Sequence, residues 1–173
     1  MVMTAPSTPD VQSILAALDE VADPEIPTVS IVELGMIGEI EIGLDEIAVE
    51  LLPTFVGCPA LEVIRDSVAA RLAPLGRQSG RAVRVNVSFA TPWSSDRISA
   101  AGRIKLRGSG FAPPPVPRPG RGLPMLDIAS APVACPYCGS LRTTLDNAFG
   151  PTQCRSIHHC ADCRQPFEAF KSI

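Results

Sequence analysis

Apolar side chains recur every three or four residues in two segments near the N-terminus, the spacing of one face of an amphipathic helix. The first segment begins after Asp10, a residue that can cap a helix, and ends at Asp23-Pro24. Its apolar positions are Val11, Ile14, Leu15, Leu18 and Val21. The second segment covers residues 59–73, with Pro59 in its first turn. Its apolar face is formed by Leu61, Ile64, Val68 and Leu72. We therefore expect two helices, each with one buried face.

Three further segments have patterns typical of β-strands. Residues 37–42 and 47–52 are rich in apolar side chains and are separated by Gly43-Leu44-Asp45-Glu46, which predicts a hairpin. Residues 83–89 alternate apolar and polar side chains and predict a third strand. A last short helix is expected to start near Ser95-Asp96 and to cover residues 98–106. The order helix, strand, strand, helix, strand predicts a small α+β sandwich with its helices on one face of the sheet.

A proline-rich stretch divides the 173-residue chain. Because proline fixes φ and lacks an N–H donor, this stretch predicts an extended linker over residues 112–132, between domains at 1–111 and 133–173. Charge changes near the same place: residues 1–97 carry 14 acidic side chains and 6 arginines, whereas residues 98–173 carry 9 basic and 4 acidic ones. The two halves could dock on each other or on different partners, or simply present solvated surfaces.

Four cysteines stand in two pairs, Cys135-Pro-Tyr-Cys138 and Cys160-Ala-Asp-Cys163. Two turns of the C-x-x-C type can direct four sulfurs at one centre, so the spacing predicts a tetrahedral Cys₄ site in a small rubredoxin-like ribbon. Zinc is the leading ligand, and the site would then be structural. Disulfides and bound iron, including an iron–sulfur cluster, are the alternatives.

Cys154 is a fifth cysteine in a module that needs only four. Together with His158 and His159 it offers additional metal ligands close in sequence to Cys160. Its alternative role is simple packing in a ribbon strand.

Cys58 is the candidate functional residue of the first domain, because it lies between the end of a predicted strand and the first turn of a predicted helix. Unpaired N–H groups and the helix dipole favour a thiolate there, so we expect a lowered pKa and a reactive or metal-binding thiol; the alternative is an inert buried cysteine. Gly57 permits a sharp turn, and the Thr54 hydroxyl can hydrogen-bond to a thiolate. Asp23 and Glu25 place two carboxylates in a rigid loop, either to complete a metal site or to cap turns.

No segment reaches the roughly 18 uninterrupted apolar residues of a membrane span, and no basic region precedes an apolar run at the N-terminus. We therefore expect a cytoplasmic protein with no membrane partner. In that compartment the six cysteines are interpreted as metal ligands and free thiols.

Several of these segments together resemble the metal–sulfur cluster assembly family that includes the SufT-like proteins. This resemblance covers residues 10 to about 90 and rests on Asp23-Pro-Glu-Ile-Pro27, Ser30-Ile-Val-Glu-Leu-Gly-Met-Ile37 and Pro53-Thr-Phe-Val-Gly-Cys-Pro-Ala60. The remainder is similar to the PaaD family (also called PaaJ), accessory components of the phenylacetyl-CoA ring-epoxidising oxygenase system. The segments concerned are Thr91-Pro-Trp-Ser-Ser-Asp-Arg-Ile98, Gly102-Arg-Ile-Lys-Leu106 and the cysteine ribbon that ends in Pro166-Phe-Glu-Ala-Phe-Lys171.

The resemblance implies an accessory protein of aerobic phenylacetate degradation that assists maturation of the monooxygenase converting phenylacetyl-CoA to its 1,2-epoxide. Its partners would be the oxygenase or reductase components, and small sheets of this family tend to pair, which implies a homodimer. Cys58 would be the functional thiol that transiently handles iron or an iron–sulfur unit, with Asp23 and Glu25 as secondary candidates. An enzymatic role in the oxidation is not expected, because the sequence has no Glu-x-x-His pair, no G-x-G-x-x-G loop and no ferredoxin cysteine run.

Three other functions compete with maturation. The oppositely charged halves favour a structural docking subunit that grips oxygenase components. A zinc ribbon with Arg142, Arg155 and Arg164 is also found in nucleic-acid-binding proteins, but the ribbon's aromatic residues have apolar neighbours and are expected in its core, so no nucleic-acid partner is predicted. A nucleophilic enzyme would need a base near Cys58, and the histidines lie in the other module.

Overall fold

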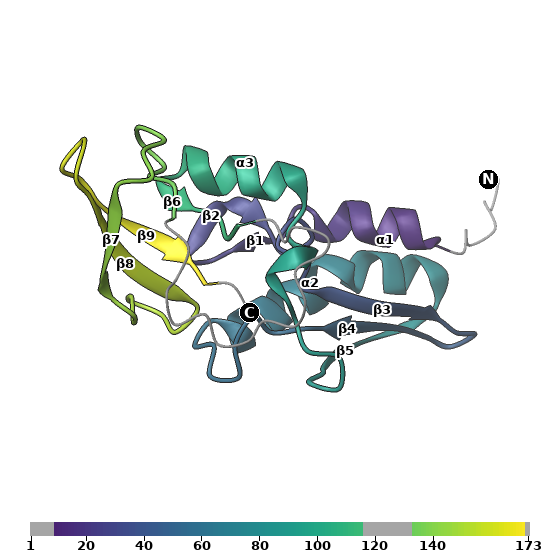
Figure 1. Ribbon diagram of the computed structural model, residues 1–173. Coiled ribbons are helices and arrows are strands. Elements are labelled where there is room, and N and C mark those ends of the chain that lie inside the picture. The colour runs from purple at the N-terminus through teal and green to yellow at the C-terminus, as the bar shows by residue number, and fades with distance from the viewer. Residues whose placement is uncertain (1–8, 116–132, 172–173) are drawn as a thin grey trace, which may run out of the picture.

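The N-terminal part of the protein is built on a three-stranded sheet (Figure 1). The computed structural model describes residues 9–115 and 133–171. Strands β3 (Ile37–Ile42) and β4 (Glu46–Leu51) form the expected antiparallel hairpin, and β5 (Ala82–Val87) pairs in parallel with β4. Helix α2 (Leu61–Ser79) makes the crossover that a parallel pair requires. Helix α1 (Val11–Leu18) packs beside α2, and both helices lie on one side of the sheet (Figure 1). The predicted α+β class is confirmed.

Local chemistry accounts for both ends of α1. The Asp10 carboxylate accepts a hydrogen bond from the Ser13 amide (2.8 Å), and the Asp10 amide donates to the Ser13 hydroxyl (3.1 Å). This reciprocal capping box satisfies donors that the first turn leaves without helical partners. The helix ends at Leu18, earlier than the predicted stop at Asp23-Pro24.

Helix α2 differs from the predicted 59–73 at both ends. Residues before Leu61 form turns, in which the Leu61 amide donates to the Cys58 carbonyl (3.3 Å), so Pro59 precedes the helix. The helix continues through Pro74 to Ser79. Gly76 lets this end of the helix approach the start of β5 closely, because a Cβ there would lie 2.8 Å from both the Arg81 carbonyl oxygen and a methyl carbon of Val83. Close packing of this end on the sheet outweighs the local cost of a proline.

Several short elements that the pattern of apolar residues did not predict connect the two parts of the chain. Strands β1 (Ala22–Asp23) and β2 (Ile26–Ser30) form a small antiparallel pair around the Pro24–Glu25 turn. The predicted last helix is split into a 3₁₀ turn, η1 (Ser95–Arg97), and helix α3 (Ala100–Gly108). Ser99 begins α3, because its hydroxyl accepts a hydrogen bond from the Gly102 amide (2.9 Å).

A second sheet contains the cysteine-rich C-terminal part. Its order is β6-β9-β8-β7, formed by β6 (Phe111–Ala112), β7 (Thr143–Asn147), β8 (Arg155–Cys160) and β9 (Pro166–Phe170). Strand β6 follows α3 directly and pairs in parallel with β9, so the segment that leaves α3 is built into the ribbon sheet. Of the predicted linker 112–132, residues 116–132 lie outside the described residues, and the domain division stays a prediction.

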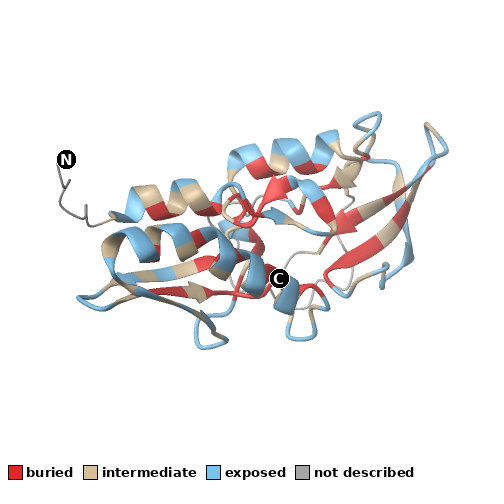
Figure 2. Ribbon diagram, turned by 180° about the vertical axis from the view of Figure 1, so that it is seen from behind, coloured by how far each residue is buried: buried red, intermediate tan, exposed pale blue. Residues whose placement is uncertain are grey.

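The main apolar core extends from the helices and the first sheet into the base of the ribbon (Figure 2). Cys154 and Phe170 belong to this core, and the Phe170 ring lies 6.1 Å from that of Trp93, centroid to centroid. A smaller core lies at the far end of the ribbon and contains Ala112, Cys135, Cys160, Phe167 and Ala169. The two parts of the chain are therefore packed on each other through buried side chains. None of the described helices is long and apolar enough to span a bilayer.

Candidate functional site

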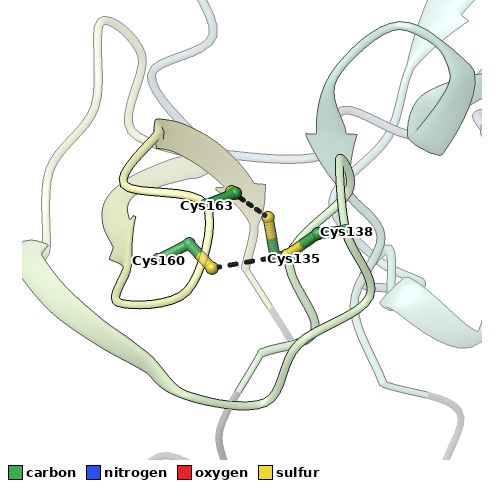
Figure 3. Close-up of side chains that lie close together, drawn as sticks. All are labelled: Cys135, Cys138, Cys160 and Cys163. Carbon is green, nitrogen blue, oxygen red and sulfur yellow. Dashed lines mark hydrogen bonds between the residues drawn. The ribbon is translucent and has the colours of Figure 1, made fainter.

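The four paired cysteines converge at the far end of the ribbon (Figure 3). All four sulfur atoms lie within 4.8 Å of one another. The sulfurs of Cys135 and Cys163 are 3.6 Å apart, as are those of Cys138 and Cys160. Each pair therefore joins one cysteine from each C-x-x-C turn, which is the arrangement that brings both turns to a single centre.

Both C-x-x-C turns have the same backbone geometry. The Gly139 amide donates to the Cys135 carbonyl and the Arg164 amide to the Cys160 carbonyl, each at 2.9 Å. The residue after each second cysteine adopts a left-handed conformation, with φ of 75° at Gly139 and 59° at Arg164. Glycine accepts this conformation readily, whereas an arginine adopts it only when its surroundings enforce it. The repeated geometry indicates a site built to hold four sulfurs.

The sulfur spacing suits a tetrahedral metal ion. With metal–sulfur bonds of about 2.3 Å, tetrahedral zinc places its sulfur ligands about 3.8 Å apart. The 3.6 Å separations are close to that value. Amide donors of Cys163 and Asp162 lower the pKa of the Cys160 thiol to about 6, whereas burial and the neighbouring sulfurs raise the pKa of Cys138 and raise that of Cys163 to about 12. Four thiolates this close together therefore require a bound cation. The four cysteines can therefore hold one thiophilic ion with no coordination position left open.

Cys154 lies at the opposite end of strand β8 from this cluster. It precedes Arg155, the first residue of β8, whereas Cys160 is the last. At about 3.3 Å per residue, six residues of extended chain separate the two cysteines by about 20 Å. His158 stacks on Phe167, with 5.5 Å between ring centroids, and burial lowers its pKa. Among the described residues the metal-competent cluster is the set of four, without Cys154 or either histidine.

Cys58 lies in the loop between β4 and α2 and is half-buried against the main core. Burial raises the pKa of its thiol, and the negative charges of Cys154, Asp23 and Glu25 raise it further, while a hydrogen bond from the Ala60 amide acts in the opposite direction. The predicted lowering of this pKa is therefore wrong. The helix begins only at Leu61, and desolvation exceeds the stabilisation that nearby backbone dipoles provide.

Thr54, Gly57 and Asp23 were predicted to support Cys58, and the structure gives each of them a different environment. Thr54 is buried. Gly57 does not adopt a positive φ, so the turn does not require glycine; a Cβ there would lie 3.6 Å from the side-chain oxygen of Gln153. The Asp23 carboxylate accepts hydrogen bonds from the Glu25 and Ile26 amides (2.8 and 3.1 Å), which is a turn-capping role.

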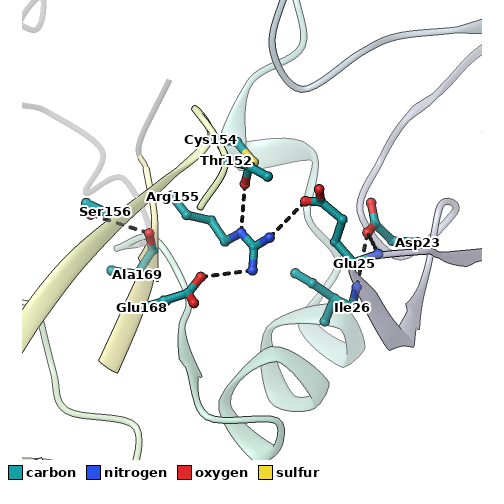
Figure 4. Close-up of polar contacts among 9 residues, drawn as sticks. All are labelled: Asp23, Glu25, Ile26, Thr152, Cys154, Arg155, Ser156, Glu168 and Ala169. Atoms are coloured by element: carbon teal, nitrogen blue, oxygen red, sulfur yellow. Dashed lines mark hydrogen bonds and ion pairs between the residues drawn. The ribbon is translucent and has the colours of Figure 1, made fainter. Parts of the chain in front are cut away.

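Glu25 is engaged by a buried arginine that sequence reasoning did not single out as part of the site (Figure 4). Arg155 donates from its two terminal nitrogens to Glu25 and Glu168, each at 2.8 Å. Its Nε donates to the Thr152 hydroxyl (2.8 Å), and its guanidinium carbon lies 5.3 Å from the centroid of the Phe111 ring. Only 8% of the Arg155 side chain is exposed. This residue ties the loop that contains Asp23 and Glu25 to the ribbon.

The raised pKa of Cys58 has a measurable consequence. Because its pKa is raised, the Cys58 thiol stays protonated in the folded protein at pH values at which it has begun to ionise in the unfolded chain. The stability that this thiol contributes is therefore fully present below its pKa in the unfolded chain. It is lost as pH rises through its higher pKa in the folded protein. We expect native Cys58 to be alkylated by iodoacetamide more slowly than in the denatured chain at pH 8, with a rate still rising above pH about 8.5. Peptide mass spectrometry after quenching measures both rates. A rate that levels off below pH 8 would contradict this assignment.

Comparisons with known proteins agree with these features. Residues 11–87 match the family model described as iron–sulfur cluster assembly protein, and residues 124–171 match the PaaD zinc beta ribbon domain. Fold and site together thus define an iron–sulfur cluster assembly domain followed by a zinc ribbon. An Escherichia coli (strain K12) protein, named as a putative subunit of 1,2-phenylacetyl-CoA epoxidase, is 33% identical over 165 residues, covering 95% of this chain and 94% of the relative. The chain belongs to this PaaD family, as the sequence motifs predicted.

Solved structures resemble part of the chain. A crystal structure of Domain of Unknown Function DUF59 from Bacillus anthracis superposes with a TM-score of 0.50 at 29% identity, covering 55% of this chain and 89% of the other. A solution structure from Mycobacterium tuberculosis, of a protein described as associated with [Fe-S] complex assembly and repair, covers 62% of this chain and 98% of the other, with 25% identity and a TM-score of 0.35. The first of these supports the α+β fold described above.

Proposed function

We propose that this protein is a non-catalytic accessory subunit of a phenylacetyl-CoA epoxidase and assists assembly of the iron or iron–sulfur cofactors of the oxygenase or its reductase. The observation that carries the proposal is the half-buried thiol of Cys58 on a fold of the iron–sulfur cluster assembly family. The relative of nearly equal length, named as an epoxidase subunit, supports the choice of client. The reducing cytoplasm suits a protein whose cysteines act as thiols and metal ligands.

We assign zinc to the ribbon and a structural role to that site. The four sulfurs leave no open coordination position, whereas a transfer site needs one. The expected composition of anaerobically purified protein is therefore one zinc per chain without acid-labile sulfide. Iron with sulfide at this position would instead make the ribbon a redox or delivery centre.

Co-expression tests the maturation function. We expect the oxygenase or its reductase to lose most of its iron or cluster when produced with Cys58→Ala, because the thiol that handles the metal is missing. Metal analysis of the purified components and epoxidation of phenylacetyl-CoA measure the loss. Ser67→Ala is the matched control: its hydroxyl donates to the Val63 carbonyl within α2, so this exposed change should leave cofactor content unaltered. Full cofactor content with Cys58→Ala would refute the proposal.

The alternative is a docking subunit without a metal-delivery role. Its support is the excess of acidic side chains in residues 1–97 and of basic ones in residues 98–173, which suits contacts with partners of opposite charge. A docking subunit should co-purify with the oxygenase in fixed stoichiometry and be needed at each turnover. A maturation factor should be dispensable once the oxygenase has been assembled.

A further inference from the structure

Two cysteines from distant parts of the sequence lie on neighbouring segments at the junction between the first domain and the ribbon. Cys154 is buried and belongs to the main core, and Cys58 packs against that core. The residues that precede them also face each other, because the Gln153 side chain lies over Gly57. The charge of Cys154 is also among the causes that raise the pKa of Cys58, which agrees with this placement of the two segments.

The segment that carries Cys154 is held in place from several directions. The Lys171 amide donates to the Cys154 carbonyl (2.9 Å), and its ammonium donates to the Gln153 carbonyl (2.7 Å). The Thr152 hydroxyl lies 3.2 Å from the Cys154 sulfur. Arg155, the next residue, reaches across to Glu25. These contacts fix the segment that carries the Cys154 thiol relative to the loop that contains Glu25.

From this geometry we propose that Cys58 and Cys154 form one two-thiolate site for the iron or iron–sulfur cargo. The inference rests on the proposed function, because the ligand class is the one assigned there to Cys58. Thiolates bind iron and other thiophilic metals, and binding to two thiols releases two protons. Because Arg155 is already paired with Glu25 and Glu168, the positive charge that stabilises the two thiolates has to come from the bound metal itself.

The number of ligands distinguishes this site from the ribbon. The ribbon provides four sulfurs, which fill every coordination position of a tetrahedral ion. At the junction, by contrast, residues 9–115 and 133–171 form no group of three or more metal-ligating side chains. Two protein ligands leave coordination positions that an incoming client can fill. A site that is incomplete in this way can accept and release its cargo, and the ribbon then serves to present Cys154 to Cys58.

Phenylarsine oxide is a probe that requires two neighbouring thiols. Its arsenic forms two As–S bonds, and its oxygen leaves as water with the two thiol protons, so no redox step is involved. We expect zinc-loaded protein to bind one equivalent while retaining its zinc. Binding should weaken about 100-fold or more with Cys58→Ser and equally with Cys154→Ser, because each change removes the chelate. Undiminished binding by Cys154→Ser, or none by the wild type, would overturn the proposal.

A second measurement uses only the wild-type protein, so its result does not depend on whether a variant folds correctly. Trypsin cleavage places Cys58 on residues 1–65, Cys154 on residues 143–155, and the two ribbon pairs on residues 122–142 and 156–164. We expect the arsenical to link peptide 1–65 to peptide 143–155. Links confined to the ribbon peptides would exclude the two-thiolate site.

Anaerobic dialysis against ferrous iron then tests the cargo. The wild type should bind one iron per chain beyond the ribbon metal, and each serine variant should lose it.

If the arsenical bridges the two thiols but the oxygenase is fully loaded without Cys58, the site stands and the maturation function fails. If the oxygenase needs Cys58 but Cys154→Ser binds arsenical and iron normally, the maturation function stands and the two-thiolate site fails.

Discussion

Replacing Cys138 with serine should abolish metal binding by the ribbon and unfold its far end. The small core there consists of Ala112, Cys135, Cys160, Phe167 and Ala169, so two of its five members are themselves metal ligands. Without the metal, little apolar surface remains to stabilise the turns. Structural zinc contributes about 10–16 kcal/mol in small cysteine-ligated modules, far more than such a core can replace. Metal analysis should show a fall from one ion per chain to nearly none.

Hydrogen exchange should locate the unfolding. The amides of Gly139 and Arg164, which close the two C-x-x-C turns, should lose their protection. The Lys171 amide, bonded to the Cys154 carbonyl beside the main core, should keep it. Cys154→Ser is the matched control, since this cysteine lies outside the four-sulfur cluster and its replacement should leave the zinc content of the ribbon unchanged. Retention of a full metal complement by Cys138→Ser would show that the site is not a Cys₄ centre.

Local patterns predicted much of this fold. The β3–β4 hairpin followed from apolar residues on both sides of a short polar turn, and the start of α1 followed from Asp10. The C-x-x-C spacing predicted the four-cysteine cluster because each turn is defined by four consecutive residues. In each case the physical cause lies within a few residues, where a single sequence displays it.

The junction could not be predicted in the same way. The Arg155–Glu25 ion pair joins residues 130 positions apart, and the β6–β9 pairing depends on strands too short to show a period. The pKa of Cys58 was mispredicted for the same reason: the helix dipole is visible in the sequence, whereas burial against the main core is not. A charged residue directly after a lone cysteine, at the start of strand β8, was the available signal for Arg155.

Replacing Arg155 with methionine should be the most damaging single change at the junction. Methionine preserves much of the length of the side chain but leaves Glu25 and Glu168 without their shared partner. Removal of one member of a buried ion pair typically costs 3–5 kcal/mol, and the partial exposure of both carboxylates places the expected loss near the lower value, about 3 kcal/mol. Chemical denaturation measures it. Alkylation of Cys58 should become faster at the same time, because the ribbon no longer covers its loop firmly.

Arg142→Met provides the matched control, because Arg142 pairs with Asp162 at nearly the same distance (2.7 Å) but on the surface, with 75% of its side chain exposed. That change should alter stability by less than about 1 kcal/mol and leave the Cys58 rate unaffected. Combining Glu25→Gln with Arg155→Met should recover part of the loss, since it removes one of the unpaired charges. Equal effects of the two arginine changes would mean that the junction is not held by Arg155, and that the Cys154 segment reaches Cys58 through apolar packing alone.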